Sequence, residues 1–185
     1  MRYFEKLVLA IAYFSKAVAA FGIAGGVALA FINVIARYIF EASLTWAGEL
    51  TIYLFLWSVF FGAVYCFYKD AHIAVDILLL KVPPKVAKIL TLISIAVAFV
   101  YVSAIAYYGY EYVKLYIELE ERSIDLDIPL WIPYSVVPIS FGLSAIILIY
   151  KFIKVWQDDN FRIKSEAEEI VEEFAKEIIE KKGKV

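Results

Sequence analysis

The chain has 185 residues, of which 63% are hydrophobic and 17% aromatic, and its mean hydropathy is +0.76. A water-soluble domain of this size could not bury so much apolar surface, so the composition indicates a membrane protein. The formal net charge is only −2 and the basic residues form no stripe, which argues against nucleic acid as a partner. One His and one Cys exclude a bis-histidine haem, an internal disulfide and a four-thiolate metal site, so no cofactor is expected.

The N-terminal residues look like a secretion signal, with early charges, a short apolar core and Ala17-Val18-Ala19 in the place of a cleavage site. The apolar run nevertheless continues without a charge from Ala17 to Ala36, which is long enough to cross a bilayer. We therefore expect an uncleaved first transmembrane span at about 17–36. Residues 3–16 either extend this helix or lie along the membrane interface.

Small residues recur every four positions in the first span, at Gly22, Gly26 and Ala30. This spacing places them on one helical face, where a neighbouring backbone can approach closely. The face predicts helix packing, either within the chain, which we favour, or against another subunit.

A polar hinge near Ala42 and Ser43 joins the first span to a second, which carries no charge from Leu50 to Tyr68. Arg37 and Glu49 lie about equally far on either side of this hinge, and therefore at similar depth if the two helices are antiparallel. Because an unpaired charge near hydrocarbon is costly, we predict an ion pair between them. In the alternative, Arg37 reaches the lipid headgroups and Glu49 stands in water.

The second span is expected at about 46–68. Trp46 falls where an interfacial aromatic belt is typical, and Trp57 is predicted to fill the core. Ser58 and Gly62 repeat the four-residue spacing of small side chains. Cys66 lies inside the apolar run, where a packed or lipid-facing thiol is expected in place of a nucleophile.

Residues 69–88 form a basic loop in which apolar residues recur along one helical face. The pattern predicts an amphipathic helix in the membrane interface between spans two and three, ended by Pro83-Pro84. His72 and Asp76 are four positions apart and share another face of this helix. Two ligands do not complete a metal site, so we expect a hydrogen-bonded pair.

The third span, at about 89–110, is followed by a segment rich in Glu and Asp. Residues 111–122 keep a helix-forming composition, so the helix is expected to project beyond the bilayer. The acidic side chains are expected to form a solvated face.

Prolines restrict the backbone where the chain turns to enter the membrane again, at Pro129, Pro133 and Pro138. Pro133 can begin the fourth span, which is expected at about 133–150, and Pro138 is expected to kink it. Trp131 is expected at the depth of the membrane interface.

The chain thus divides into a four-span membrane domain, 1–157, and a tail, 158–185. The tail carries one apolar stripe and favourable Glu–Lys pairs, but it is too polar to cross a membrane. We expect a soluble amphipathic helix that docks on a partner, self-associates or lies at the membrane surface.

Basic residues gather before the first span, between spans two and three, and after span four. The positive-inside rule therefore places both termini and the 69–88 loop in the cytoplasm. The hinge and residues 111–133 then face outward. We expect a multi-pass protein of the cytoplasmic (inner) membrane, in contact with the lipid bilayer.

Several short stretches keep a characteristic order and spacing over roughly residues 30–142. They are Ile35-Ala36-Arg37-Tyr38-Ile39-Phe40, Trp46 with Glu49, Trp57 with Phe61-Gly62-Ala63, His72-Ile73-Ala74-Val75-Asp76 with Pro83, and Ile128-Pro129-Leu130-Trp131-Ile132-Pro133-Tyr134 with Pro138. In these stretches the chain resembles the DctQ-like family, the small membrane subunit of tripartite ATP-independent periplasmic (TRAP) transporters. It departs from the family where two adjacent acids often follow the Trp, since only Glu49 is present, and where Ile139-Ser140 replaces a Gly after the last Pro.

The resemblance implies an importer built from three proteins. A soluble extracytoplasmic substrate-binding protein captures an organic acid, often a dicarboxylate or sialic acid, and a large TRAP membrane subunit moves it with sodium. The small subunit holds no substrate. It braces the static part of the large subunit in the bilayer, and it is a candidate docking point for the binding protein.

Our leading hypothesis is therefore a non-catalytic transporter subunit. A rival is an autonomous small channel or transporter formed by self-association, in which Asn33, Arg37 and Glu49 line a path. A membrane enzyme is a third hypothesis, disfavoured by the single His and the single Cys. The candidate structural or partner-contact residues are Arg37, Trp46, Glu49, Trp57, Gly62, His72, Asp76, Pro129, Trp131, Pro133 and Pro138, with Gly22, Gly26 and Ala30 in helix packing.

Overall fold

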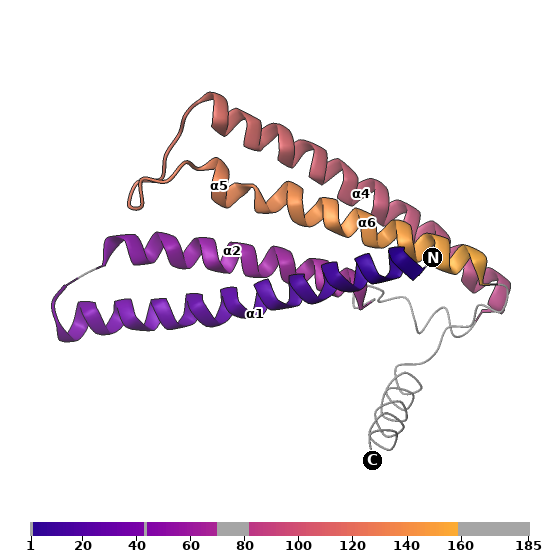
Figure 1. The fold of residues 1–185 in the computed structure, drawn as a ribbon, viewed down its shortest axis with the longest axis horizontal. Helices are drawn as coiled ribbons and strands as arrows, with labels where there is room; N and C mark the ends of the chain where they lie inside the picture. The colour runs from indigo at the N-terminus through magenta and orange to yellow at the C-terminus, as the bar shows by residue number, and fades with distance from the viewer. Residues whose placement is uncertain (1, 43, 70–81, 159–185) are drawn as a thin grey trace, which may run out of the picture.

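The computed structural model describes residues 2–42, 44–69 and 82–158. They form four long helices and a short one (Figure 1), namely α1 (Arg2–Ile39), α2 (Thr45–Tyr68), α4 (Pro84–Glu118), α5 (Trp131–Tyr134) and α6 (Val136–Gln157). Four stretches are long and apolar enough to cross a bilayer, with α5 and α6 counting as one. The prediction of an all-α membrane protein with four spans is thus confirmed for the described residues. The interfacial helix and the tail helix fall on residues 70–81 and 159–185, outside the described part.

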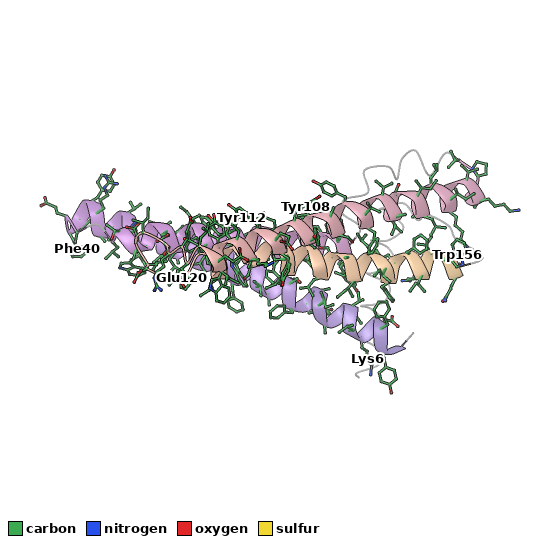
Figure 2. All side chains as sticks on the ribbon, turned by 90° about the horizontal axis from the view of Figure 1, so that it is seen from above. Lys6, Phe40, Tyr108, Tyr112, Glu120 and Trp156 are labelled. Atoms are coloured by element: carbon green, nitrogen blue, oxygen red, sulfur yellow. The ribbon has the colours of Figure 1, made fainter. Side chains whose placement is uncertain are left out.

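Two antiparallel hairpins, α1/α2 and α4/α6, lie side by side, with α2 and α6 between α1 and α4 (Figure 1). Lys6 and Trp156 mark one end of the molecule and Phe40 marks the other (Figure 2). We call the first the inner end, a label that follows the predicted topology. The outer end carries the hinge between α1 and α2 and the loop of residues 119–130.

Three helices extend beyond the predicted spans, because a charge limits membrane crossing but does not stop a helix. Residues 3–16 continue α1, so the extended helix is the correct alternative. The 38 residues of α1 measure about 57 Å in length, nearly twice the roughly 30 Å of the hydrocarbon core. α4 continues to Glu118, as expected for a helix that projects from the bilayer, and α6 continues past Tyr150 to Gln157.

Two apolar clusters meet on α6. Val8 of α1 and Val64 of α2 pack with Ile147, whereas Ile95 and Val102 of α4 pack with the adjacent Leu148. Neighbouring residues of α6 therefore face different hairpins, which makes α6 the common wall of the bundle.

Glycines bring α1 close to α2. A Cβ at Gly22 would lie 2.8 Å from the carbonyl oxygen of Leu54 and 2.9 Å from the Cβ of Ser58, and a Cβ at Gly26 would overlap the ring of Phe55. Real Cβ atoms do not approach so closely, so only glycine permits this distance between the two backbones. The small-residue face of α1 is therefore a packing surface within the chain.

The other small residues at this contact are less restrictive. The hydroxyl of Ser58 donates a hydrogen bond across the contact to the carbonyl of Ala19. A Cβ at Gly62 would meet the Cβ of Ala19 at 3.8 Å, an ordinary contact distance, so the backbones do not require glycine there. Ala30 is partly buried.

The fourth span is interrupted at Ser135, between α5 and α6. A continuous helix would need a hydrogen bond from the N–H of residue 138 to the carbonyl of Tyr134, and proline has no N–H. The series of backbone hydrogen bonds along the helix is therefore interrupted just before Pro138. Gly109 of α4 leaves room for the break, because a Cβ there would lie 2.9 Å from Cγ1 of Val137 and 3.3 Å from Cδ of Pro138. The structure thus has an interruption next to Pro138, where the sequence predicts a kink, and the helical part of the span begins at Trp131 instead of Pro133.

Candidate functional site

Glu49, in the second turn of α2, connects the first hairpin to the loop between α4 and α5. Its Oε2 accepts the backbone N–H groups of Asp125 (3.0 Å) and Leu126 (2.9 Å). Its Oε1 accepts the hydroxyl of Tyr53, one turn further along α2 (2.7 Å). Hydrogen bonds to a charged acceptor are stronger than those between neutral groups, so this carboxylate holds the loop firmly. We call the arrangement the Glu49 clasp.

The loop held by the clasp, residues 119–130, is folded back on itself. The Ser123 N–H donates to the carbonyl of Ile128 (2.8 Å), and the Ile128 N–H donates to the hydroxyl of Ser123 (3.2 Å). Nε of Arg122 lies 2.6 Å from Oδ1 of Asp127 in an ion pair. The outer loop therefore has its own internal structure in addition to its attachment to α2.

Trp57 makes a second connection between the two hairpins. Its indole N–H donates to the carbonyl of Pro133 in α5 (3.1 Å), beside the interruption at Ser135. Its ring stacks on Phe61, with the ring centroids 5.7 Å apart. Trp57 therefore orients α5 as well as filling space.

Replacing Trp57 by Phe is expected to lower the free energy of unfolding by about 1 kcal/mol, because ring packing largely remains while the hydrogen bond to Pro133 is lost. Thermal unfolding of the purified protein in detergent measures the change. Trp46→Phe is the matched control, since Trp46 is 41% exposed and should shift the midpoint little. Equal losses in the two variants would argue against a specific contribution of the bond.

The predicted ion pair between Arg37 and Glu49 does not form. Residues 49 and 58 differ by nine positions, or about 2.5 turns, which places them on opposite sides of α2. Ser58 faces α1, so Glu49 faces away from α1 and towards the outer loop. Arg37 is exposed in the last turn of α1. The prediction is wrong because equal depth in the membrane does not give two side chains the same direction.

The remaining predicted residues are distributed as follows. Pro129 pairs with Arg122 in an isolated antiparallel bridge of the outer loop. Trp46 and Trp131 are 41% and 40% exposed, and their place in an aromatic belt stays a prediction. His72 and Asp76 lie outside the described residues.

Two residues with a clear role, Tyr53 and Gly109, are not among those predicted. Tyr53 follows Glu49 by four positions, so their spacing on one helical face could have indicated the pair. Gly109 gives no such signal, because the requirement for glycine at this position depends on where Pro138 packs against α4.

Few residues of the four spans are fully buried within the described part of the chain. In an apolar stretch of 18 residues from each span, the fraction of residues that are buried is 11% in α1, 17% in α2 and in α4, and 28% in the last span. Exposed large side chains include Phe21 and Phe31 on α1 and Val97 and Val100 on α4. The two outermost helices therefore present apolar faces that the rest of the described chain does not cover.

The described residues form contacts between helices and loops. Within residues 2–42, 44–69 and 82–158, no three His, Cys, Asp or Glu side chains come close enough together to hold a metal ion. Cys66 is a free, partly buried thiol. The four apolar spans define a multi-pass helical membrane protein, and the Glu49 clasp and the Trp57 hydrogen bond join its two hairpins.

The sequence matches the family described as tripartite ATP-independent periplasmic transporters, DctQ component, over residues 26–158. The protein therefore belongs to the DctQ family, whose members are transporter components and not enzymes. This confirms the resemblance found in the sequence.

Curated relatives agree with this assignment. The C4-dicarboxylate TRAP transporter small permease protein DctQ of Rhodobacter capsulatus is 27% identical over 113 residues, which cover 61% of this chain and 48% of that protein. The protein of the same description from Vibrio cholerae is 29% identical over 82% of this chain and 76% of its own length. The isethionate TRAP transporter permease protein DctMQ of Oleidesulfovibrio alaskensis is 28% identical over 70% of this chain, but the match covers only 22% of that protein. The chain thus spans about half of the first relative, most of the second and a small part of the third.

Proposed function

We propose that the chain is the small membrane subunit of a TRAP-type secondary transporter and that it braces a larger membrane subunit in the bilayer. The observation that carries this proposal is the exposed apolar surface on both outer helices, combined with the fastening of the two hairpins to each other. A brace needs a body that keeps its shape and offers its outer faces to a neighbour. The Glu49 clasp and the Trp57 bond to Pro133 supply the first property, and α1 and α4 supply the second.

A relative in which the matching region is part of a longer polypeptide supports the proposal that this chain packs against a larger membrane subunit. In the DctMQ permease of Oleidesulfovibrio alaskensis, the region similar to this chain is 22% of one polypeptide, so it is joined covalently to a much longer one. The equivalent neighbour of this chain would be a separate large subunit that packs against its exposed helices.

Two of the three residues that an autonomous channel would place along its path have other roles. Asn33 uses its side-chain oxygen to accept the Leu44 N–H at the hinge (3.2 Å), and Glu49 is occupied by the clasp. The apolar runs 17–36, 50–68, 89–110 and 133–150 contain no charged residue. Intramembrane charges usually mark ion and substrate pathways, so their absence from these runs favours the brace over the channel.

The cargo we propose is an organic acid, with dicarboxylates as the first candidates. The relatives are described as transporting C4-dicarboxylates and isethionate, which are both small organic anions. A soluble extracytoplasmic protein would deliver the acid and the large subunit would move it with sodium. In this arrangement the chain lies in the inner membrane with both termini in the cytoplasm and its outer end towards the binding protein.

Photo-crosslinking tests the brace. A photoreactive residue at Phe21 on α1, Ile52 on α2 or Val97 on α4 samples three exposed faces in native membranes. We expect at least one face to give an adduct with a large polytopic membrane protein. Val102, which is fully buried against α6, is the control and should give no intermolecular adduct. Adducts with lipid alone from all three faces would contradict the proposal.

A further inference from the structure

A hollow with a volume of about 250 Å³ lies at the outer end, between the last turn of α4 and the loop held by the Glu49 clasp. Its lining combines two aromatic rings with charged groups. The aromatic residues are Tyr116 and Trp131, and the charged ones are Glu120, Glu121 and Arg122.

The aromatic wall of this outer hollow is fixed by its neighbours. The ring of Tyr116 stacks on Tyr134, with the centroids 5.1 Å apart and the planes at 13°. The hydroxyls of Tyr112 and Tyr116 share a hydrogen bond of 2.8 Å. Tyr108, Tyr112 and Glu120 follow one another towards the outer end (Figure 2). These contacts fix the orientation of the Tyr116 ring at the edge of the hollow.

The charge of the hollow is negative. Its one cation, Arg122, is already paired with Asp127, and Lys114 pairs with Glu118 on α4 (3.9 Å). Glu120 and Glu121 have no ion-pair partner within the described part of the chain. Glu120 also has a φ of 52°, the left-handed conformation that turns the chain at the end of α4. Aromatic faces and free carboxylates both attract a cation, whereas they would repel an organic anion.

We propose that the outer hollow receives a Lys or Arg side chain of a soluble extracytoplasmic protein that docks on this end. Tyr116 lies six positions past the end of the charge-free run at Tyr110, which is about 9 Å along the helix, so the hollow stands outside the hydrocarbon. The surrounding outer loop carries further acids, which makes a basic protein surface electrostatically complementary. This inference rests on the proposed function, because the docking protein would be the binding protein of the same transporter.

The test titrates the purified binding protein of the transporter against the small and large subunits together in nanodiscs. The double variant Glu120→Gln/Glu121→Gln is expected to weaken binding about tenfold and to make the affinity less dependent on salt. Trp131→Leu is expected to weaken it severalfold without changing the salt dependence. Glu118→Gln is the matched control, because this exposed acid is already paired with Lys114, and it should bind within about twofold of the native chain.

Unchanged binding by the double variant, or an equal loss in the Glu118 control, would overturn the inference. A lipid ammonium group is the other cation of suitable chemistry. Native mass spectrometry in phosphatidylethanolamine and phosphatidylcholine nanodiscs separates this case, and loss of a bound lipid with intact protein docking would also overturn the proposal. Failure of the large subunit to co-purify with the native chain would refute the proposed function itself, independently of Glu120 and Glu121.

Discussion

The Gly22→Ala variant is expected to lose about 1 kcal/mol of its free energy of unfolding. Its new Cβ would meet the backbone oxygen of Leu54 at 2.8 Å, and a backbone atom cannot turn aside as a side-chain tip can. Overpacking of this kind costs about 1–3 kcal/mol, and the better helix propensity of Ala offsets about 1 kcal/mol of the loss. Reversible unfolding in detergent or bicelles measures the change.

Gly25→Ala is the matched control, three positions away on the same helix. Its Cβ would find only Cδ1 of Leu54, at 3.7 Å, so the gain in helix propensity should leave this variant as stable as the native chain or more stable by up to about 1 kcal/mol. Gly22→Ala and Gly25→Ala change the helix propensity equally, so a difference in their stability reports the contact that each new Cβ makes. If the two variants unfold alike, the close approach of α1 and α2 is not what Gly22 provides.

Glu49→Ala is expected to release the outer loop. The amides of Asp125 and Leu126 lose their common acceptor, and hydrogen bonds to a charged group contribute about 1.5–3 kcal/mol. Amide hydrogen exchange at these two positions should therefore accelerate by about 10- to 100-fold. Exchange in the middle of α6 should change much less, because its burial does not depend on the clasp.

Two variants serve as controls for the clasp. Tyr53→Phe removes one donor to Glu49 but leaves both bonds to the loop, so it should accelerate exchange only slightly. Glu41→Ala removes an exposed acid at the hinge and should change neither amide. Unchanged exchange in Glu49→Ala would mean that the loop is held by its internal bonds alone.

The sequence predicts the spans because hydrophobicity over a bilayer's length is a strong signal. The full lengths of the helices are not predicted, since charges such as Lys16 and Lys151 limit the apolar run without breaking backbone hydrogen bonds. The position of Pro138 predicts a disturbance of the last helix. The interruption falls at Ser135 because Pro138 leaves the carbonyl of Tyr134 without its helical hydrogen-bond donor.

The candidate site is less predictable, because its contacts depend on the direction in which each side chain leaves its helix as well as on its depth in the membrane. Glu49 and Arg37 are placed correctly along their helices, but Glu49 points to the side of α2 opposite Ser58. Its partners in the loop are backbone N–H groups, which every residue except proline carries, so the sequence gives no sign of them. The spacing of small residues also does not show which positions must be glycine. The contact between the helices requires glycine at position 22 but not at position 62.

Uptake by proteoliposomes tests the central claim most directly, namely that the exposed apolar faces support a larger membrane neighbour and do not enclose a route. Vesicles with the purified chain alone, given a sodium gradient and a labelled dicarboxylate, are predicted to take up no more than empty vesicles. Vesicles that also contain the large subunit, supplied with the binding protein, are predicted to accumulate the acid. Sodium-driven uptake by the chain alone would contradict the account.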